Sequence, residues 1–101
     1  MKEIKYIQPI TDEDKVKIYF NKRRGKITKF VVQYFGLING RWCSIMRIDN
    51  CHGYPHKHTY HLQKKEYVIL LEKDNNAAFT EAKQFVLKEF KKIKDNFLLT
   101  K

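Results

Sequence analysis

The sequence predicts an α+β domain in which an antiparallel sheet of four or five strands carries one C-terminal helix packed on one face. Two observations support this prediction. Segments rich in β-branched and aromatic residues, separated by turn residues, extend to residue 71. From Asn76 onward the apolar residues recur at helical spacing instead. The 101 residues suffice for a single domain, residues 1–101, and are too few for two.

Turn residues divide the first part of the chain. Pro9 and residues 11–14, Thr-Asp-Glu-Asp, predict the first turn. The polar residues 21–26 predict a hairpin turn in which Gly25 can take a positive φ. The segments with strand character are, in order, Ile4–Ile7, Val16–Phe20, Ile27–Ile38, Trp42–Ile48, His58–Leu62 and Tyr67–Leu71.

A second hairpin is expected at Asn39-Gly40, which lies between two apolar runs. Asn-Gly favours the type I′ turn, whose twist matches that of antiparallel strands. Further along, Gly53 and Pro55 predict a loop before strand character resumes.

One apolar stripe indicates the C-terminal helix and its buried side, with Asp74, Asn75 or Asn76 available as the N-cap. The stripe comprises Phe79, Ala82, Val86, Phe90, Ile93 and Phe97. The opposite side carries Lys83, Lys88, Lys91, Lys92 and Lys94. We expect the rings in the core rather than stacked on bases, and the lysines in solvent or beside phosphates.

The charge balance indicates a polyanionic partner. The chain has 21 Lys and Arg against 11 Asp and Glu, a formal net charge of +10. An excess of this size on a small surface attracts phosphates, most strongly at low salt. A lysine-rich surface also arises without such a partner, which is the competing explanation.

Nothing in the sequence predicts export or a membrane span. The first residues lack the basic-then-apolar pattern of a secretory signal, and no apolar run approaches the roughly 20 residues that cross a bilayer. We therefore expect a soluble, cytoplasmic protein without a membrane partner. In that setting Cys43 and Cys51 are expected to be free thiols.

The four histidines lie within ten residues of one another. Histidine both accepts and donates protons near neutral pH, so a pair can act as base and acid on a phosphodiester. In RNA the base would take the 2′-OH proton and the acid would protonate the departing 5′-oxygen, without a metal or another cofactor. The catalytic candidates are His52, His56, His58, Arg47 and Asp49.

Strand alternation makes His56 and His58 a plausible unit. If both lie in a strand, their imidazoles share one face, while His61 points to the other. Arg47 is expected to stabilise the extra charge of the transition state. Asp49 is expected to orient a histidine through its second ring nitrogen.

A second set of residues is expected to contact nucleic acid. Residues 21–29 contribute five basic side chains and no acid, as a phosphate-binding hairpin tip would, although any exposed hairpin also uses a charged turn. The binding candidates are Lys22, Arg23, Arg24, Lys26, Lys29, Lys57, Tyr60 and His61.

A metal site would use many of the same side chains. Cys51, His52, His56, His58 and Asp49 are all competent ligands for zinc or a transition metal. Their spacing matches none of the paired structural zinc patterns. We therefore rank metal-free chemistry above a metal site and expect no cofactor. A third reading treats the histidines as solvent-exposed residues of a loop and an edge strand.

Residues 47–61 read Arg-Ile-Asp-Asn-Cys-His-Gly-Tyr-Pro-His-Lys-His-Thr-Tyr-His and resemble the R-x-D-N-x-H-G…H-x-H signature of TumE-type toxins and their small archaeal and bacterial relatives. The resemblance covers this segment and the order of strands followed by one helix. It implies the toxin half of a toxin–antitoxin module that acts on RNA. Tyr54-Pro55 and His61 depart from the usual pattern. The matching positions are Arg47, Asp49, Asn50, His52, Gly53, His56 and His58.

Three functions are therefore considered. The first is a toxin-like, metal-independent endoribonuclease, with RNA ranked above DNA as substrate and an antitoxin protein as partner. The second is a non-catalytic nucleic-acid-binding module with a basic, histidine-lined surface. The third is a metal-binding protein, or an interaction protein encoded by a virus or mobile element. A homodimer is compatible with each of them.

Overall fold

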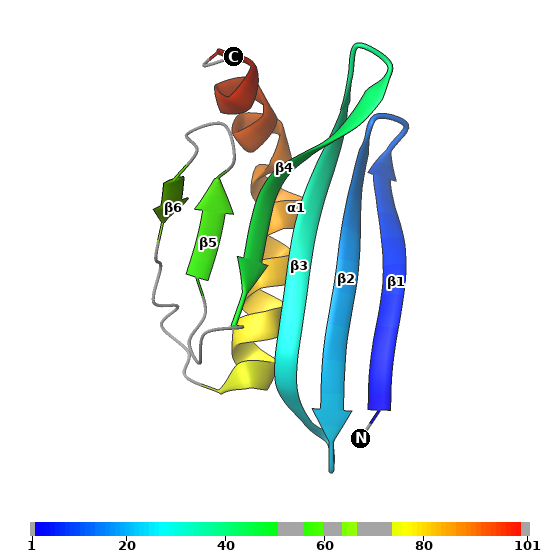
Figure 1. Cartoon of the computed structure of the whole chain (residues 1–101), viewed down its shortest axis with the longest axis vertical. Helices are drawn as coiled ribbons and strands as arrows, with labels where there is room; N and C mark the ends of the chain where they lie inside the picture. The colour runs from blue at the N-terminus through cyan, green and yellow to red at the C-terminus, as the bar shows by residue number, and fades with distance from the viewer. Residues whose placement is uncertain (1, 51–55, 60–63, 67–73, 100–101) are drawn as a thin grey trace.

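The computed structural model describes residues 2–50, 56–59, 64–66 and 74–99. In this part of the chain a six-stranded sheet has the order β1-β2-β3-β4-β5-β6, and every neighbouring pair is antiparallel (Figure 1). The elements are β1 (Lys2–Thr11), β2 (Asp14–Arg23), β3 (Lys26–Ile38), β4 (Arg41–Asp49), β5 (His56–Thr59), β6 (Lys64–Glu66) and α1 (Asn75–Leu99). The predicted α+β class, with one antiparallel sheet and one C-terminal helix, is confirmed.

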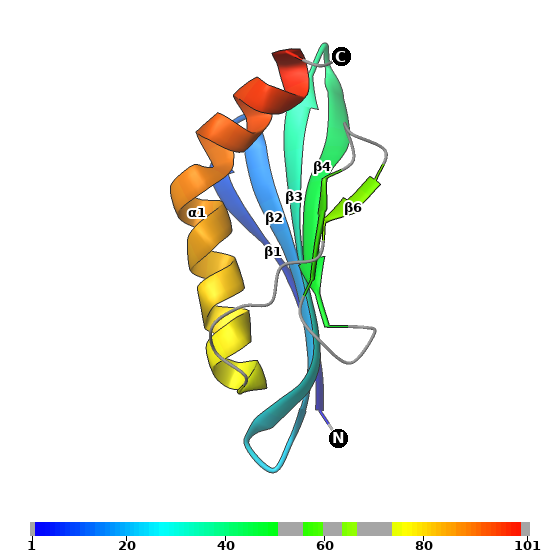
Figure 2. The same cartoon turned by 90° about the vertical axis from the view of Figure 1, so that its left-hand side faces the viewer.

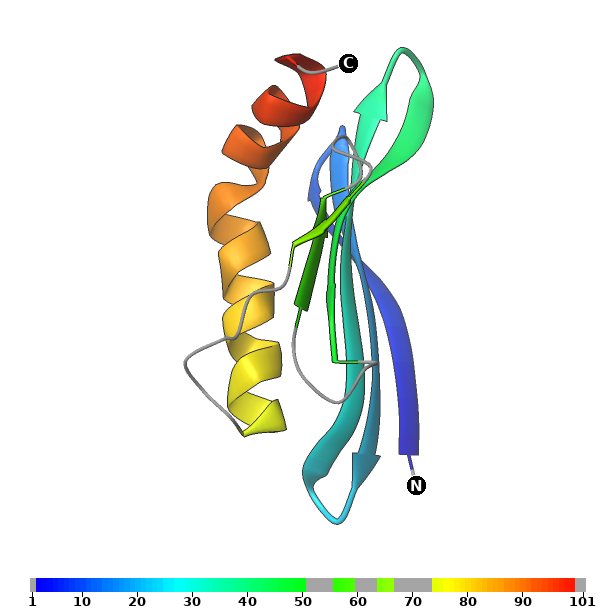
Figure 3. The ribbon, with the colours of Figure 1, turned by 60° about the vertical axis from the view of Figure 1, so that its left-hand side comes forward.

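Helix α1 lies along one face of the sheet, where it packs against β3 and β4 (Figures 2 and 3). No described helix covers the other face, which we call the open face. Alternate residues of β2 and β3 point toward α1 and are buried in the core, because side chains alternate between the two faces of a strand. These core residues include Val16, Ile18, Phe30, Val32 and Tyr34.

Both two-residue hairpins have positive φ at each turn position. The φ angles are 51° at Arg24 and 77° at Gly25, and 52° at Asn39 and 76° at Gly40. Positive φ at both central residues characterises the type I′ turn. The hairpins predicted at Gly25 and at Asn39-Gly40 are thus confirmed.

The first strand is longer than the sequence indicates. β1 continues through Pro9, which pairs with Lys15, and the turn to β2 falls on Asp12 and Glu13. The prediction that Pro9 belongs to the turn is therefore wrong. Proline is tolerated here because β1 is an edge strand, where a residue without an N–H group does not interrupt a ladder on both sides.

Helix α1 begins as predicted, with Asp74 as its N-cap. The Asp74 carboxylate accepts a hydrogen bond from the Asn76 N–H at 2.8 Å, and its backbone carbonyl accepts one from Ala78 at 2.8 Å. The Asn76 side chain joins the helix start to β3, since its Oδ1 accepts from the Ile27 N–H at 2.7 Å. The predicted apolar stripe is buried, except that Phe79 is half-buried and packs against the Phe20 ring at 5.0 Å between centroids.

One lysine assigned to the solvated side of the helix is instead part of a buried polar cluster. The Lys94 side chain is 16% exposed, and its ammonium lies 3.3 Å from the Asp14 carboxylate. Asp14 also accepts hydrogen bonds of 2.5 Å from the Tyr34 and Thr11 hydroxyls. Burial raises the pKa of Asp14, but the Thr11 and Tyr34 hydroxyls and the Lys94 charge outweigh it, so the pKa lies below its ordinary value. Burial and the Asp14 carboxylate raise the pKa of Tyr34.

The last two strands differ from expectation in their bounds. β5 begins at His56 rather than His58, and β6 occupies Lys64–Glu66, which the charged sequence Lys-Lys-Glu did not indicate. The predicted strand at Tyr67–Leu71 and the predicted loop through Gly53 and Pro55 lie outside the described residues. Within the described part, no helix is long and apolar enough to cross a membrane.

Candidate functional site

The pairing of β4 with β5 joins four of the predicted catalytic positions. In the backbone register Arg47 lies opposite His58, and Asp49 lies opposite His56. Residues directly opposite each other on antiparallel strands belong to the same face of a sheet. Positions 56 and 58 therefore share the open face with Arg47 and Asp49. The expectation that positions 56 and 58 lie in one strand is confirmed.

These positions belong to two adjacent rows that cross the sheet. Each row gains residues from β1, β2 and β3, which are distant from residues 47–61 in the sequence. The first row contains Ile7, Lys17, Gln33, Arg47, His58 and Lys65. The second row contains Lys5, Tyr19, Val31, Asp49 and His56.

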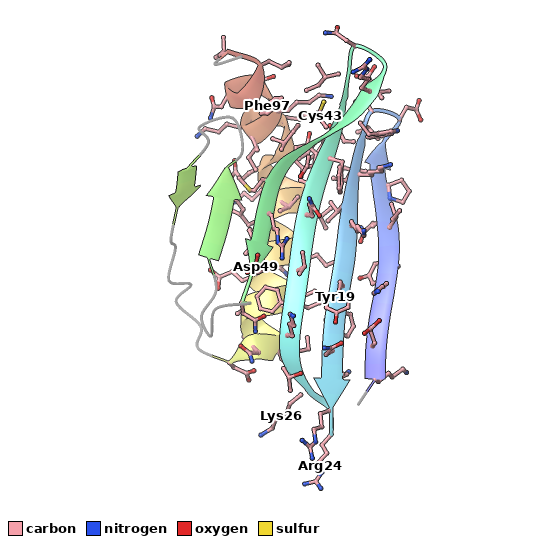
Figure 4. The ribbon with its side chains drawn as sticks, viewed as in Figure 1. Tyr19, Arg24, Lys26, Cys43, Asp49 and Phe97 are labelled. Carbon is pink, nitrogen blue, oxygen red and sulfur yellow. The ribbon has the colours of Figure 1, made fainter. Side chains whose placement is uncertain are left out.

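Arg47 and Asp49 form an ion pair at the end of β4, where Figure 4 labels Asp49. The Arg47 Nε donates to Asp49 Oδ2 at 2.7 Å, while the Asp49 side chain is only 2% exposed. A carboxylate removed from water needs such a charged partner. Arg47 stays partly exposed, with 35% of its side chain accessible, so its guanidinium reaches the open face while anchored by Asp49.

Asn50, a matched position of the toxin signature, has a structural role. Its side chain is buried, and its Oδ1 accepts from the Phe30 N–H at 2.9 Å. Its Nδ2 donates to the Thr28 carbonyl at 3.3 Å. The amide thus continues the β3–β4 connection where strand β4 has ended, and it holds the chain leaving Asp49 against β3.

A pocket of about 340 Å³ opens on this face beside Arg47. Three of its lining residues are cations, and the Lys5 ammonium lies 5.4 Å from the centroid of the Tyr19 ring. Such a concave, cationic site with an aromatic wall suits a phosphate attached to a planar group. The lining residues are Lys5, Lys17, Tyr19, Val31, Gln33 and Arg47.

The basic hairpin lies at the end of the sheet nearest Asp49, with Arg24 and Lys26 at its tip (Figure 4). Arg23, Arg24, Lys26 and Lys29 are exposed, and Lys22 is half-buried. Lys29 pairs with Asn21 in the row next to that of Asp49 on the open face. Position 57, in contrast, lies opposite Ile48 and belongs to the rows on the helix side.

Several candidates lie outside the described residues, namely Cys51, His52, Gly53, Tyr60 and His61. Among the described side chains, no group of three His, Cys, Asp or Glu residues could hold a metal ion. Cys43 is a half-buried free thiol that contacts the Arg41 carbonyl at 3.7 Å.

Sequence reasoning missed the residues that β1, β2 and β3 bring to the site. Lys5, Lys17, Tyr19 and Gln33 line the pocket with Arg47, although none was a candidate. The signal was present in β2, where the polar residues Lys17 and Tyr19 alternate with core residues and so share one face. The pairing of those residues with Arg47 depends on the register of four strands, which the sequence does not display.

A family model matches residues 1–101. The chain belongs to the family described as a domain of unknown function, DUF7718. No curated protein and no solved structure matched the chain. Because the DUF7718 description names no activity, the function of the site must be inferred from its geometry and chemistry.

Proposed function

We propose that this DUF7718 protein is a metal-independent endoribonuclease whose site is formed by Arg47, Asp49, His56 and His58. The observation that carries the proposal is the β4–β5 register, in which the two histidine positions lie opposite the Arg47–Asp49 ion pair. Histidine both accepts and donates protons near neutral pH. Two histidine positions then share one face with Arg47 beside a cationic pocket.

The proposed reaction is transfer of the phosphoryl group within RNA. One imidazole removes the 2′-OH proton, and the 2′-oxygen bonds to phosphorus as the bond from phosphorus to the 5′-oxygen breaks. The other imidazole gives its proton to that 5′-oxygen. The products are a 2′,3′-cyclic phosphate and a 5′-hydroxyl, so neither water nor a metal enters this step.

Arg47 and Asp49 have supporting parts in this reaction. The guanidinium, held by the buried Asp49 carboxylate, stabilises the negative charge that develops on the phosphoryl oxygens. Asp49 lies opposite position 56, which supports it as the group that orients that imidazole. Loss of either residue would leave the other without its ion-pair partner, and the cost is greater for loss of Arg47 because the Asp49 carboxylate is the more deeply buried of the two.

The resemblance of residues 47–61 to TumE-type toxins supports a cellular role as a toxin controlled by an antitoxin protein. Expression of the chain alone is then expected to arrest growth, and the His56→Ala/His58→Ala variant is expected to be tolerated. Equal growth with both proteins, each recovered in soluble form, would contradict the toxin role without bearing on cleavage in vitro.

The direct test is incubation of the purified chain with labelled single-stranded RNA in EDTA. The parent is expected to cleave, and the double variant His56→Ala/His58→Ala to lose at least about 100-fold in rate, since acid–base catalysis typically contributes that much or more. Lys88→Ala, on the exposed side of α1, is the matched control and should cleave like the parent. Equal cleavage by the parent and a folded double variant would refute the proposal.

A second function is favoured by the cationic pocket itself. Lys5, Lys17 and Arg47 beside Tyr19 suit a module that binds nucleic acid without cleaving it. In that case RNA binding falls steeply with salt, no product appears, and His56→Ala/His58→Ala changes the affinity little.

A further inference from the structure

We propose that single-stranded RNA lies across the open face from β1 and β2 to β4, with bases stacked on Tyr19 and Trp42 and phosphates held by Lys5, Lys15 and Lys17. The proposal rests on the proposed function for its choice of RNA. It adds that the RNA is single-stranded and that it binds on the open face of the sheet. Neither stacking residue lies in residues 47–61.

Trp42 supplies the first stacking surface. It is the only tryptophan of the chain, it lies opposite Leu37 near the start of β4, and it is 42% exposed. The Lys15 ammonium lies 4.0 Å from the centroid of the Trp42 ring and 5.9 Å from that of Phe35. An exposed indole with a cation on one side offers a base both stacking and a nearby positive charge.

Tyr19 supplies the second stacking surface, at the pocket. Its hydroxyl lies 3.0 Å from Asn21 Oδ1 and 3.5 Å from Glu3 Oε2, so the ring is held at its outer end. Lys5 lies 5.4 Å from the ring centroid. Tyr19 therefore repeats the combination of an aromatic ring and a lysine found at Trp42 and Lys15.

The two stacking surfaces share a face and lie apart along the strands. On β3, Val31 pairs with Tyr19 and Leu37 pairs with Trp42, and the six residue steps between them span roughly 20 Å. Lys17 and Gln33 lie in one of the two rows between them and line the pocket. The surface is thus long enough for several nucleotides, and it passes beside Arg47.

The charges along this surface suit a polyanion. Lys5, Lys15 and Lys17 all lie on the open face, and the Asp49 carboxylate is neutralised by Arg47. Glu3 opposes binding of a polyanion, because its negative carboxylate lies 3.3 Å from the Lys5 ammonium and offsets the positive charge there. Its replacement should therefore strengthen binding, whereas loss of a lysine should weaken it.

The geometry favours single strands over a duplex. Bases in a duplex are stacked on one another and present only their edges, so they cannot lie against Tyr19 and Trp42. Unpaired bases expose their faces and stack on aromatic side chains with little dependence on sequence. In-line attack of a 2′-oxygen also requires a backbone that is not held in a regular helix.

The test uses the full chain carrying His56→Ala/His58→Ala, so that RNA survives the titration. Because Trp42 is the only tryptophan, its fluorescence reports directly on stacking. An unpaired oligouridylate is expected to quench this fluorescence, and a blunt RNA duplex of the same length is expected to leave it nearly unchanged. Quenching by both to the same extent, or by neither, would overturn the proposal.

Fluorescence anisotropy of labelled RNA then measures how much each residue contributes to RNA affinity. In the same background Trp42→Ala, Tyr19→Leu and Lys17→Ala should each weaken binding at least about fivefold. Glu3→Gln should tighten it. Phe85→Ala is the matched aromatic control, because Phe85 is 38% exposed but belongs to α1, and it should bind as the background does. Equal affinity for Trp42→Ala, Tyr19→Leu and Phe85→Ala would overturn the proposal.

The binding surface and the ribonuclease activity can be refuted separately. Cleavage by the parent, with no quenching and no effect of Tyr19→Leu, would retain the ribonuclease and overturn the binding surface. Quenching and binding without cleavage by the parent would retain the surface and refute the ribonuclease.

Discussion

Arg24 occupies a backbone conformation that suits glycine or asparagine better than arginine. Its φ of 51° lies in the left-handed region, which costs most residues roughly 1–2 kcal/mol. Arg24→Asn should therefore raise the free energy of unfolding by about 0.5–1 kcal/mol, measured by urea denaturation. Lys26→Asn, at an exposed position outside the two central turn residues, is the control and should give no such gain. A lower stability for Arg24→Asn would show that the arginine makes a compensating contact.

The lowered pKa of Asp14 indicates how the free energy of unfolding depends on pH. Its folded-state pKa lies below the ordinary value of 3.8, because the Thr11 and Tyr34 hydroxyls and Lys94 favour the carboxylate despite burial. The resulting stability is fully present above the unfolded-state pKa and is lost as pH falls through the folded-state pKa. Urea midpoints measured from pH 6 to pH 2.5 should therefore fall less steeply below about pH 4 for Asp14→Asn than for the parent. Parallel curves would contradict this assignment.

Among the elements, β3 leaves no free space for a side chain at Gly36, where Ile45 of β4 and Lys94 of α1 lie close to the backbone. A Cβ at this position would lie 2.7 Å from Ile45 Cδ1 and 3.3 Å from Lys94 Cε. Both atoms end flexible side chains, so Gly36→Ala is expected to fold with a loss of about 1–3 kcal/mol, measured by thermal or urea denaturation. Gly36→Ala/Ile45→Val removes the closer contact and should recover part of the loss. A double variant no more stable than the single one would place the cost elsewhere.

Elements whose signals are local could be predicted from the sequence. The Asn39-Gly40 hairpin and the start of α1 at Asp74 follow from turn and capping chemistry within a few residues. Pro9 was wrongly predicted to lie in a turn. A strand can contain proline when it lies at the edge of a sheet, and the edge position of β1 is not visible in the local sequence. Lys94 was misplaced for a similar reason, since its partner Asp14 lies 80 residues earlier in the chain.

The candidate site also contains residues that the local sequence indicates and residues that only the strand register brings together. Arg47, Asp49, His56 and His58 were candidates because of their residue types, and only the shared strand of positions 56 and 58 was predicted. Their alignment across β4 and β5, and the contribution of Lys5, Lys17 and Tyr19, depend on register and could not be derived from residues 47–61 alone.

In the whole molecule, the two faces of the sheet differ in what they contact: one packs against α1, and no described helix covers the other. Helix α1 and the core residues of β2 to β4 stabilise one face, so the residues of the open face are under no packing constraint from the helix. The open face then carries lysines, the exposed Trp42 ring, the half-buried Tyr19 ring and the Arg47–Asp49 pair. Substitutions at Lys17 should accordingly leave the melting temperature within about 2 °C while they change RNA binding.

Cleavage of RNA by histidine chemistry without a metal leaves characteristic ends, so the chemical identity of the cleaved ends decides whether the proposed reaction occurs. Single-stranded RNA treated with the parent protein in EDTA would be examined by mass spectrometry. We expect fragments that end in 2′,3′-cyclic phosphate and begin with 5′-hydroxyl, and we expect none of them with His56→Ala/His58→Ala. Fragments with 3′-hydroxyl and 5′-phosphate ends, which arise when water attacks phosphorus, would contradict the proposed reaction.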